Sequence, residues 1–424
     1  MNILKISLVV SVLTALASCQ VEESQVAEDQ VEQSTAPIAE SDNQIVIGVI
    51  DTINSAILDE DRDLWIYVPK SASEPENSNI KYPVMYLLDG NAHFHSVSGM
   101  IRRLSSASSR KVAPEMIIVG IPNTDRMRDL TPTHVEGTTG GGREFLDFVE
   151  NEVIPYVEGN YPASTYRTFV GHSLGGLTVI DALINRSDVF SNYVAIDPSL
   201  WWDDQFLLRK AEAALTEVNF SGKSLFVAVA NTMRGDMNIN NVVEDTSDAT
   251  RHIRSILQFS KSADAEKGND LNFGWEYYDN DSHGSVPLIA EYDAFRFLFP
   301  WHELKGFNDY FTPESTATVT EVIDHVLAHY QNISSHFEYL VVPPEQYVDM
   351  LADAFLRSEK PDIAFAMFSM NLQNYSDSAG AHDAMGDFYV AQEDIIKAAE
   401  HFTNAIDLGG TDSKEKLEEL QEQN

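Results

Sequence analysis

The hexapeptide at residues 171–176, Gly-His-Ser-Leu-Gly-Gly, constrains the fold of this chain more than any other stretch. An apolar run, 166–170, precedes it, and a helix-like run, 177–185, follows it. In a G-x-S-x-G turn the serine occupies a tight bend between a strand and a helix, and the glycines let neighbouring backbone pass without Cβ clashes. The pattern therefore predicts that Ser173 is a nucleophile exposed at the end of a strand.

The surrounding sequence alternates strand patterns with helix patterns. Strands are expected at 44–50, 64–68, 82–88, 116–121, 166–170, 193–196, 225–229 and 273–278. Helices are expected near 97–104, 143–154, 177–185, 205–216, 248–260 and 287–298. This rhythm predicts a doubly wound, mostly parallel α/β sheet, in which ligands bind beyond the carboxyl ends of the strands.

Length and charge narrow the class of protein further. With 424 residues the chain can form one large domain and a smaller one. Its formal net charge of -38 argues against nucleic acid and anionic membrane surfaces as partners, since both attract basic patches.

The first 19 residues have the pattern of a bacterial lipoprotein signal peptide. One lysine precedes an apolar run, 6–17, that is too short to span a bilayer, and Leu-Ala-Ser-Cys at 16–19 resembles a lipobox. Cys19 is the only cysteine in the chain, so we expect it to be lipidated rather than paired in a disulfide. Gln20 favours the outer membrane under the lipoprotein sorting pattern. We expect 20–43, which is poor in large apolar residues, to be a disordered acidic tether.

The end of the chain changes from β patterns to helical patterns. The expected α/β domain covers 44–303 and is followed by a helical linker, 304–343. Within 344–424, apolar positions recur at a spacing of 34, as in the pairs Leu351 and Met385 or Ala364 and Ala398. That period predicts tetratricopeptide-like helix pairs, which could bind a protein partner.

A serine hydroxyl needs a histidine to accept its proton, and the histidine needs a carboxylate to orient it. After this kind of elbow the acid and then the histidine follow in chain order. His283 lies in the loop between the last strand and the last helix of the sheet, so its position predicts the base. His252 falls inside an expected helix and is interpreted as a surface or packing residue.

Position in the chain does not select one carboxylate as the partner of the histidine. The loop after the strand at 225–229 offers several carboxylates, and a carboxylate at a helix start is often only a cap. The candidates are Asp236, Glu244, Asp245 and Asp248.

Two backbone N–H groups are expected to hold the developing oxyanion. Leu174 follows the nucleophile, and Asn91 lies after the strand at 82–88. Trp201, Trp202 and Phe94 are candidates for the substrate pocket.

The pair His93 and His95 invites a metal assignment. No third ligand with suitable spacing accompanies it, so we expect no metal and no cofactor.

Five motifs, spread over roughly residues 45–300, together resemble the putative esterase (esterase D) family of α/β hydrolases. That family includes ferric-siderophore, feruloyl and acetylxylan esterases, S-formylglutathione hydrolases and mycolyltransferases. The motifs are Leu-Leu-Asp-Gly at 87–90, Val-Gly-Ile-Pro-Asn at 119–123 with Arg-Met-Arg-Asp-Leu-Thr-Pro at 126–132, Ile-Pro-Tyr at 154–156, the elbow at 171–176, and Pro-Ser-Leu-Trp-Trp at 198–202.

The resemblance implies a Ser-His-acid triad and an acyl-enzyme intermediate. In the mycolyltransferase branch the acid precedes the helix after the seventh strand, which favours Asp245 or Glu244, and we take Asp245. The feruloyl esterase branch favours Asp236 instead. The expected function is an envelope serine esterase acting on a small-molecule, glycan or siderophore ester. The alternatives are an acyltransferase with a sugar or lipid acceptor, and a partner-binding scaffold with an inactive hydrolase domain.

Overall fold

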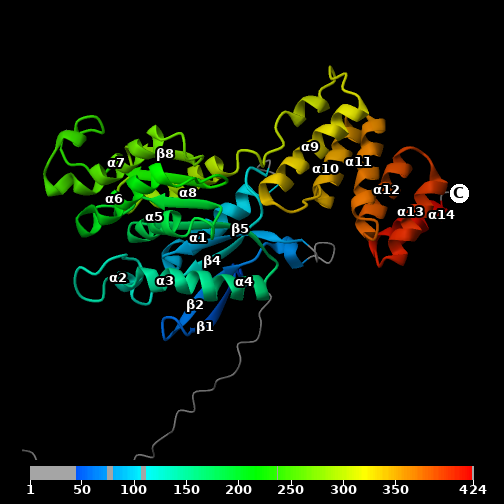
Figure 1. Ribbon diagram of the computed structural model, residues 1–424. Coiled ribbons are helices and arrows are strands. Elements are labelled where there is room, and N and C mark those ends of the chain that lie inside the picture. Colours follow the sequence, from blue (N-terminus) through cyan, green and yellow to red (C-terminus); the bar gives the residue numbers. More distant parts are fainter. Residues whose placement is uncertain (1–43, 74–79, 107–110, 236, 423–424) are drawn as a thin grey trace, which may run out of the picture. The chain divides into compact units, whose positions relative to one another are not determined.

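The computed structural model describes residues 44–73, 80–106, 111–235 and 237–422. Eight strands form one sheet in the order β1-β2-β4-β3-β5-β6-β7-β8 (Figure 1). Strands β4, β3, β5, β6, β7 and β8 run parallel, and β1 and β2 add an antiparallel edge. The strands are β1 (Val49–Ser55), β2 (Glu60–Tyr67), β3 (Tyr82–Leu88), β4 (Ile117–Ile121), β5 (Ala163–His172), β6 (Asn192–Ile196), β7 (Ser224–Ala230) and β8 (Asn272–Tyr278). The predicted doubly wound, mostly parallel sheet is confirmed.

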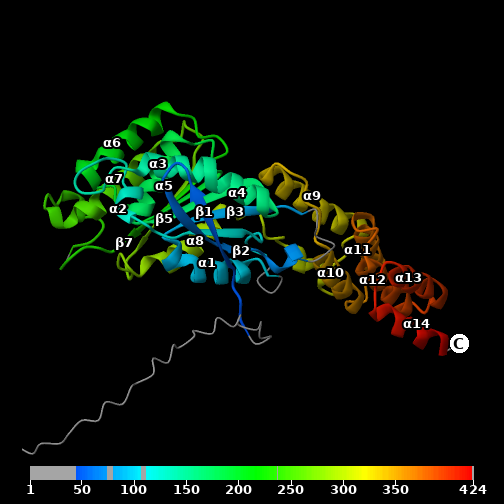
Figure 2. The ribbon, with the colours of Figure 1, turned by 90° about the horizontal axis from the view of Figure 1, so that it is seen from below.

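Helices cover both faces of this sheet. Apolar side chains of α1 and α8 pack with one set of strand residues, and those of α3 to α7 pack with the opposite set. Figure 2 shows α1 and α8 on one side of the sheet and α3, α4 and α5 on the other. Their bounds are α1 (Gly90–Leu104), α2 (Arg126–Asp129), α3 (Gly142–Phe148), α4 (Ile154–Asn160), α5 (Leu174–Asn185), α6 (Trp202–Glu217), α7 (Arg251–Ala265) and α8 (Val286–Leu298).

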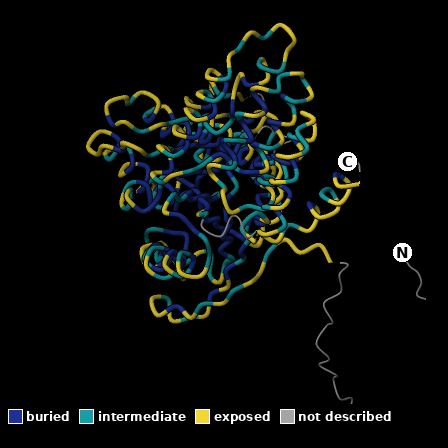
Figure 3. Tube along the Cα trace, turned by 90° about the vertical axis from the view of Figure 1, so that its right-hand side faces the viewer, coloured by how far each residue is buried: buried dark blue, intermediate teal, exposed yellow. Residues whose placement is uncertain are grey.

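The central strands are apolar because both of their faces are covered. Every residue of β3, β4 and β6 is buried, and Figure 3 shows the buried stretches gathered inside the fold. A parallel sheet with helices on both sides has no solvated face, so its strands read as continuous apolar runs. The predicted limits of these strands lie within one residue of the observed ones.

The first strand was predicted too early in the chain. The apolar residues Ile45, Val46 and Ile47 are exposed, 94% for Ile45, and β1 begins only at Val49. Strand β1 pairs only with β2, with Val49 opposite Ile66 and Ser55 opposite Glu60. Hairpin register decides the limits of an edge strand, so its polar residues pair as well as its apolar ones.

The remaining helices lie after the sheet. They are α9 (Val319–Phe337), α10 (Glu345–Arg357), α11 (Pro361–Asn374), α12 (Ala379–Ala391), α13 (Ile395–Asp407) and α14 (Asp412–Glu422). The starts of α10 and α12 lie 34 residues apart, and so do those of α11 and α13. The predicted equivalents Leu351 and Met385 are both buried, as are Ala364 and Ala398. The helix pairs have the expected period, while the tetratricopeptide assignment and the domain limits stay predictions.

Asp349 on α10 should make the stability of the protein depend on pH. Burial, followed by nearby Glu345 and other carboxylates, raises the pKa of Asp349 to about 7 although Asn371 donates to it at 2.6 Å. A carboxyl whose pKa is raised on folding stabilises the fold at low pH, and that contribution is lost as the pH rises from about 4 to about 7. Asp349→Asn should therefore raise the free energy of unfolding at pH 8 by on the order of 2 kcal/mol and have little effect at pH 4.

Thermal or urea unfolding at both pH values checks this, with the exposed Asp362→Asn as a matched control. Equal effects of Asp349→Asn at pH 4 and pH 8 would contradict the expected linkage.

The predicted signal peptide 1–19, with Cys19, and the tether 20–43 lie outside the described residues. Within the described ranges, no helix has both the length and the apolar character needed to cross a bilayer.

Candidate active site

The predicted elbow is present, with Ser173 between the end of β5 and the start of α5. Ser173 has φ 61° and ψ -115°, a backbone conformation that non-glycine residues rarely adopt. A Cβ on Gly171 would lie 2.4 Å from the backbone of Gly175, so only glycine permits the strand and helix to approach this closely. The bend places the Ser173 hydroxyl beyond the carboxyl end of the sheet.

The structure brings His283 to Ser173 as predicted. His283 lies in the loop after β8, three residues before α8. Its Nε2 atom is 3.1 Å from Ser173 Oγ, which is hydrogen-bond distance for a base that accepts a hydroxyl proton. Ser173 Oγ also lies 3.3 Å from the hydroxyl of Ser199.

The carboxylate beside His283 is Asp197, not the predicted Asp245. His283 Nδ1 lies 2.5 Å from Asp197 Oδ2. Asp245 instead accepts hydrogen bonds from Ser247 Oγ and Thr250 Oγ1 in the turn before α7, and these bonds lower its pKa to about 2. Asp245 therefore stabilises a local turn, and its prediction as the partner of His283 is wrong.

The other acid candidates do not replace Asp197. Glu244 and Asp248 are exposed on short 3₁₀ turns, and Asp236 lies outside the described residues.

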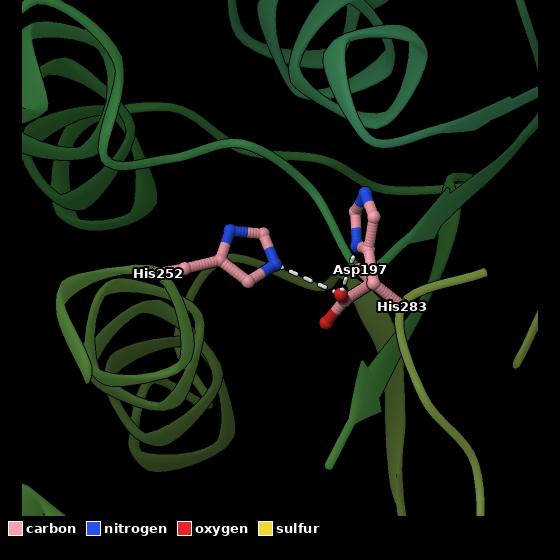
Figure 4. A group of neighbouring side chains, drawn as sticks. All are labelled: Asp197, His252 and His283. Atoms are coloured by element: carbon pink, nitrogen blue, oxygen red, sulfur yellow. Dashed lines mark hydrogen bonds and ion pairs between the residues drawn. The ribbon is translucent and has the colours of Figure 1, made fainter. Parts of the chain in front are cut away.

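Asp197 is fully buried and ionised. Its side chain is 0% exposed, and burial alone would raise its pKa. Hydrogen bonds from His252 Nε2 at 2.8 Å and from His283 outweigh burial and lower the pKa to about 2 (Figure 4). The Ala230 N–H also donates to Asp197 Oδ1 at 2.9 Å. A carboxylate in this state can accept a hydrogen bond from the Nδ1–H of His283 and stabilise the charged form of that ring.

The sequence prediction placed the acid in the loop after β7, whereas Asp197 lies earlier in the chain. It directly follows β6, which pairs with the nucleophile strand β5, so its carboxylate lies one strand away from Ser173. The signal was present in the sequence: an aspartate at the end of a wholly apolar strand must find donors when it is buried. His252 was missed as well, since it was interpreted as a surface or packing residue.

Both predicted oxyanion donors lie in the first turn of a helix. Leu174 begins α5, and Asn91 is the second residue of α1. Backbone N–H groups in the first turn have no acceptor within the helix, so they are available to an oxyanion. The two positions therefore suit the role that the sequence assigned to them.

Asp89 joins the turn before α1 to the elbow. Its carboxylate accepts from Arg126 Nε and Asn123 Nδ2, each at 2.6 Å, and Arg126 Nη2 also donates to the carbonyl of His172 at 3.2 Å. Burial raises the pKa of Asp89, but these partners outweigh it and lower the pKa overall. The pairing explains why Leu-Leu-Asp-Gly, Asn123 and Arg126 occur together as motifs.

His172 provides a neutral neighbour for His283. Its ring centroid lies 4.5 Å from that of His283, and burial lowers the pKa of His172 to about 4. An uncharged ring in this place does not repel a positive charge formed on His283.

Only one of the three predicted pocket residues is open to solvent. Trp201 is 38% exposed. Trp202 is buried and donates from Nε1 to Thr133 Oγ1 at 3.1 Å, and Phe94 is 4% exposed and packs edge-on against Trp65. Trp202 and Phe94 thus pack in the core, and the assignment of the three residues to a substrate pocket stays a prediction.

A metal site could be considered where Asp197, His252 and His283 meet. In the part of the chain that the structure describes, they form a group whose ligand atoms lie within 4.8 Å of one another, and His93 and His95 belong to no such group. The two Asp197 contacts, 2.5 and 2.8 Å, are hydrogen-bond lengths. Ligands around tetrahedral zinc lie roughly 3.4 Å apart. The distances between these three residues therefore fit hydrogen bonds better than coordination of a metal ion.

The fold and the Ser-His-Asp arrangement define an α/β hydrolase. The chain belongs to the family described as "Putative esterase", whose model matches residues 55–276, just over half of the chain.

Curated relatives resemble this chain over part of their length. The ferri-bacillibactin esterase BesA of Bacillus subtilis is 31% identical over an alignment 182 residues long, which covers 38% of this chain and 62% of the relative. The siderophore triacetylfusarinine C esterase of Aspergillus fumigatus is 34% identical over 142 residues, 31% of this chain and 49% of the relative. The chain thus spans about half to three fifths of the length of these relatives.

Solved structures support the same fold. An IroE-like serine hydrolase from Shewanella oneidensis is 29% identical, with a TM-score of 0.63 over 77% of this chain and 99% of that one. An uncharacterised protein from Capnocytophaga ochracea, 18% identical, has a TM-score of 0.56 over 88% of this chain and 99% of that one, which shows likeness of fold alone.

Proposed function

We propose that this protein is a serine esterase with Ser173 as nucleophile, His283 as general base and Asp197 as the acid. The observation that carries the proposal is the continuous contact from Ser173 Oγ to His283 Nε2, 3.1 Å, and from His283 Nδ1 to Asp197 Oδ2, 2.5 Å. Serine and histidine in this geometry can perform acyl transfer.

The proposed reaction has two halves. Ser173 Oγ attacks the ester carbonyl while His283 Nε2 takes the hydroxyl proton, and the Leu174 and Asn91 N–H groups hold the oxyanion. Collapse breaks the bond to the alcohol, which leaves with the proton from His283. Water, deprotonated by His283, then attacks the acyl-serine, and the acid is released as Ser173 recovers its proton. No cofactor takes part in the proposed steps.

We further propose a siderophore ester as the substrate class. The support is likeness: the two relatives described above are named as esterases of ferri-bacillibactin and of the siderophore triacetylfusarinine C. The formal net charge of -38 disfavours binding of free anionic ligands. Because bound iron changes the charge of a siderophore, the iron-loaded and iron-free siderophores should be compared as substrates.

The test uses the full chain with a short-chain aryl ester and with catecholate and hydroxamate siderophore esters, each with and without ferric iron. We expect hydrolysis of the aryl ester and of at least one siderophore ester, lost in Ser173→Ala. If wild type hydrolyses none of these esters, the esterase proposal fails and a partner-binding scaffold is favoured. If an added sugar or lipid alcohol speeds the reaction and is itself converted to a new ester, the protein is an acyltransferase instead.

We also propose that Cys19 is lipidated and anchors the protein in the cell envelope, most simply at the outer membrane. The support is the apolar run at 6–17 followed by Leu-Ala-Ser-Cys. In a bacterial host, labelled fatty acid should enter the wild type and not Cys19→Ala, and the variant should leave the membrane fraction. Equal labelling of both proteins would refute the anchor.

For the helical end of the chain, the 34-residue spacing of α10 with α12 and of α11 with α13 supports tetratricopeptide-like repeats. Such repeats commonly bind a protein, and we propose a protein partner for them. Co-purification from a native envelope with the full chain, compared with a chain ending at residue 343, tests this proposal. Identical sets of co-purified proteins would count against it.

A further inference from the structure

A second histidine meets the acid of the site. His252, the second residue of α7, places Nε2 2.8 Å from Asp197 Oδ2, the same oxygen that lies 2.5 Å from His283 Nδ1 (Figure 4). We propose that His252 is a positioning residue, which holds the Asp197 carboxylate in the orientation that His283 requires. The proposal rests on the proposed function and extends the triad to Ser173–His283–Asp197–His252.

The oxygen atoms of Asp197 show why a second donor matters. Oδ1 accepts one hydrogen bond, from the Ala230 N–H at 2.9 Å, and Oδ2 accepts those of His252 and His283. Without His252, each oxygen would keep one donor, and on Oδ2 only the loop residue His283 would oppose rotation of the carboxylate. When a buried carboxylate loses a donor, part of its desolvation penalty is no longer offset by a hydrogen bond.

The protonation state follows from the same contacts. The pKa of Asp197, about 2, makes the carboxylate an acceptor only, so both histidines must donate to it. His283 then carries its proton on Nδ1 and turns the Nε2 lone pair toward Ser173, as a general base requires. His252 carries a proton on Nε2, and its hydrogen bond stabilises the negative charge of the Asp197 carboxylate.

The two histidines differ in how rigidly the fold holds them. His283 lies in a loop and its side chain is 41% exposed, whereas His252 lies on a helix and is 20% exposed. The next residue along α7, Ile253, is fully buried in the core. The rings of the two histidines meet edge-on with centroids 5.1 Å apart. A helical residue thus restrains both the carboxylate and the ring of the loop residue.

Three proteins separate positioning from mere packing: wild type, His252→Ala and His252→Gln, whose amide nitrogen can donate from nearly the place of Nε2. We expect His252→Ala to lower kcat on the order of 10- to 100-fold with KM within about twofold, and His252→Gln to restore most of the loss. A kcat for His252→Ala within twofold of wild type, or equal losses in both variants, would overturn the proposal.

A double-mutant cycle shows whether His252 acts through Asp197. In the Asp197→Asn background, His252→Ala should lower kcat less than about twofold, and a full additional loss of kcat would overturn the proposal.

A second readout needs no activity. In the full chain labelled with ¹⁵N-histidine, Asp197→Asn should shift the His252 Nε2 resonance and leave unchanged the resonance of His134, which bonds to Thr139. An unmoved His252 resonance refutes the contact, while failure to hydrolyse any ester refutes only the proposed function.

Discussion

Replacing His283 with alanine should lower kcat for ester hydrolysis on the order of 10⁵- to 10⁶-fold. Its Nε2 atom, 3.1 Å from Ser173 Oγ, is the base that accepts the serine proton and later delivers a proton to the leaving alcohol. Without it, the hydroxyl is too weak a nucleophile to form an acyl-enzyme at a useful rate. Steady-state kinetics with an aryl ester measure the loss.

Two further variants make this result specific. The double variant Ser173→Ala/His283→Ala should be no slower than either single variant, because the two side chains act in one step. His95→Ala, which removes an exposed histidine of α1, should stay within about threefold of wild type. Additive losses in the double variant would mean that Ser173 and His283 act in separate steps, contrary to the proposed mechanism.

The second large effect distinguishes two aspartates. Asp197→Asn should lower kcat on the order of 10⁴-fold, because an amide can donate to His283 and hold it in the wrong tautomer. Asp245→Asn is the matched control: that residue caps a local turn, and we expect less than about a threefold change. A large loss in Asp245→Asn with an active Asp197→Asn would restore the original assignment and contradict the geometry.

The pH dependence of stability also differs between Asp197 and an ordinary carboxyl. Its pKa falls from an ordinary 3.8 to about 2 in the folded protein. A group with a depressed pKa stabilises the fold above its unfolded pKa, and the contribution is lost as the pH falls from about 4 to about 2. Above about pH 4 Asp197 thus stays ionised and can accept the hydrogen bond from His283 Nδ1.

Much of the fold followed from the sequence because the central strands are buried on both faces. Their apolar runs and the helices between them leave few other arrangements, and the elbow identifies which strand carries the nucleophile. His283 was also predictable, since the loop before the last helix is the expected place for the base. The edge strand β1 was displaced because exposed apolar residues such as Ile45 imitate a strand.

Chain order alone did not identify the acid, because it allows the loops after β6 and β7 alike. Asp197 and His283 meet through the pairing of β6 with β5 and β7, and only tertiary structure brings a residue after β6 to a loop after β8. Asp245 looked equally acidic in sequence, but Ser247 and Thr250 occupy its carboxylate. The contact of His252 with Asp197 likewise depends on where α7 packs.

The most direct test of the account is the mass of the full chain after reaction with a fluorophosphonate. We expect one phosphonyl group per chain, mapped by peptide sequencing to Ser173, no adduct in Ser173→Ala, and strongly slowed labelling in His283→Ala and Asp197→Asn. An unlabelled wild-type protein, or an adduct on a residue other than Ser173, would contradict the claim that this elbow carries the nucleophile.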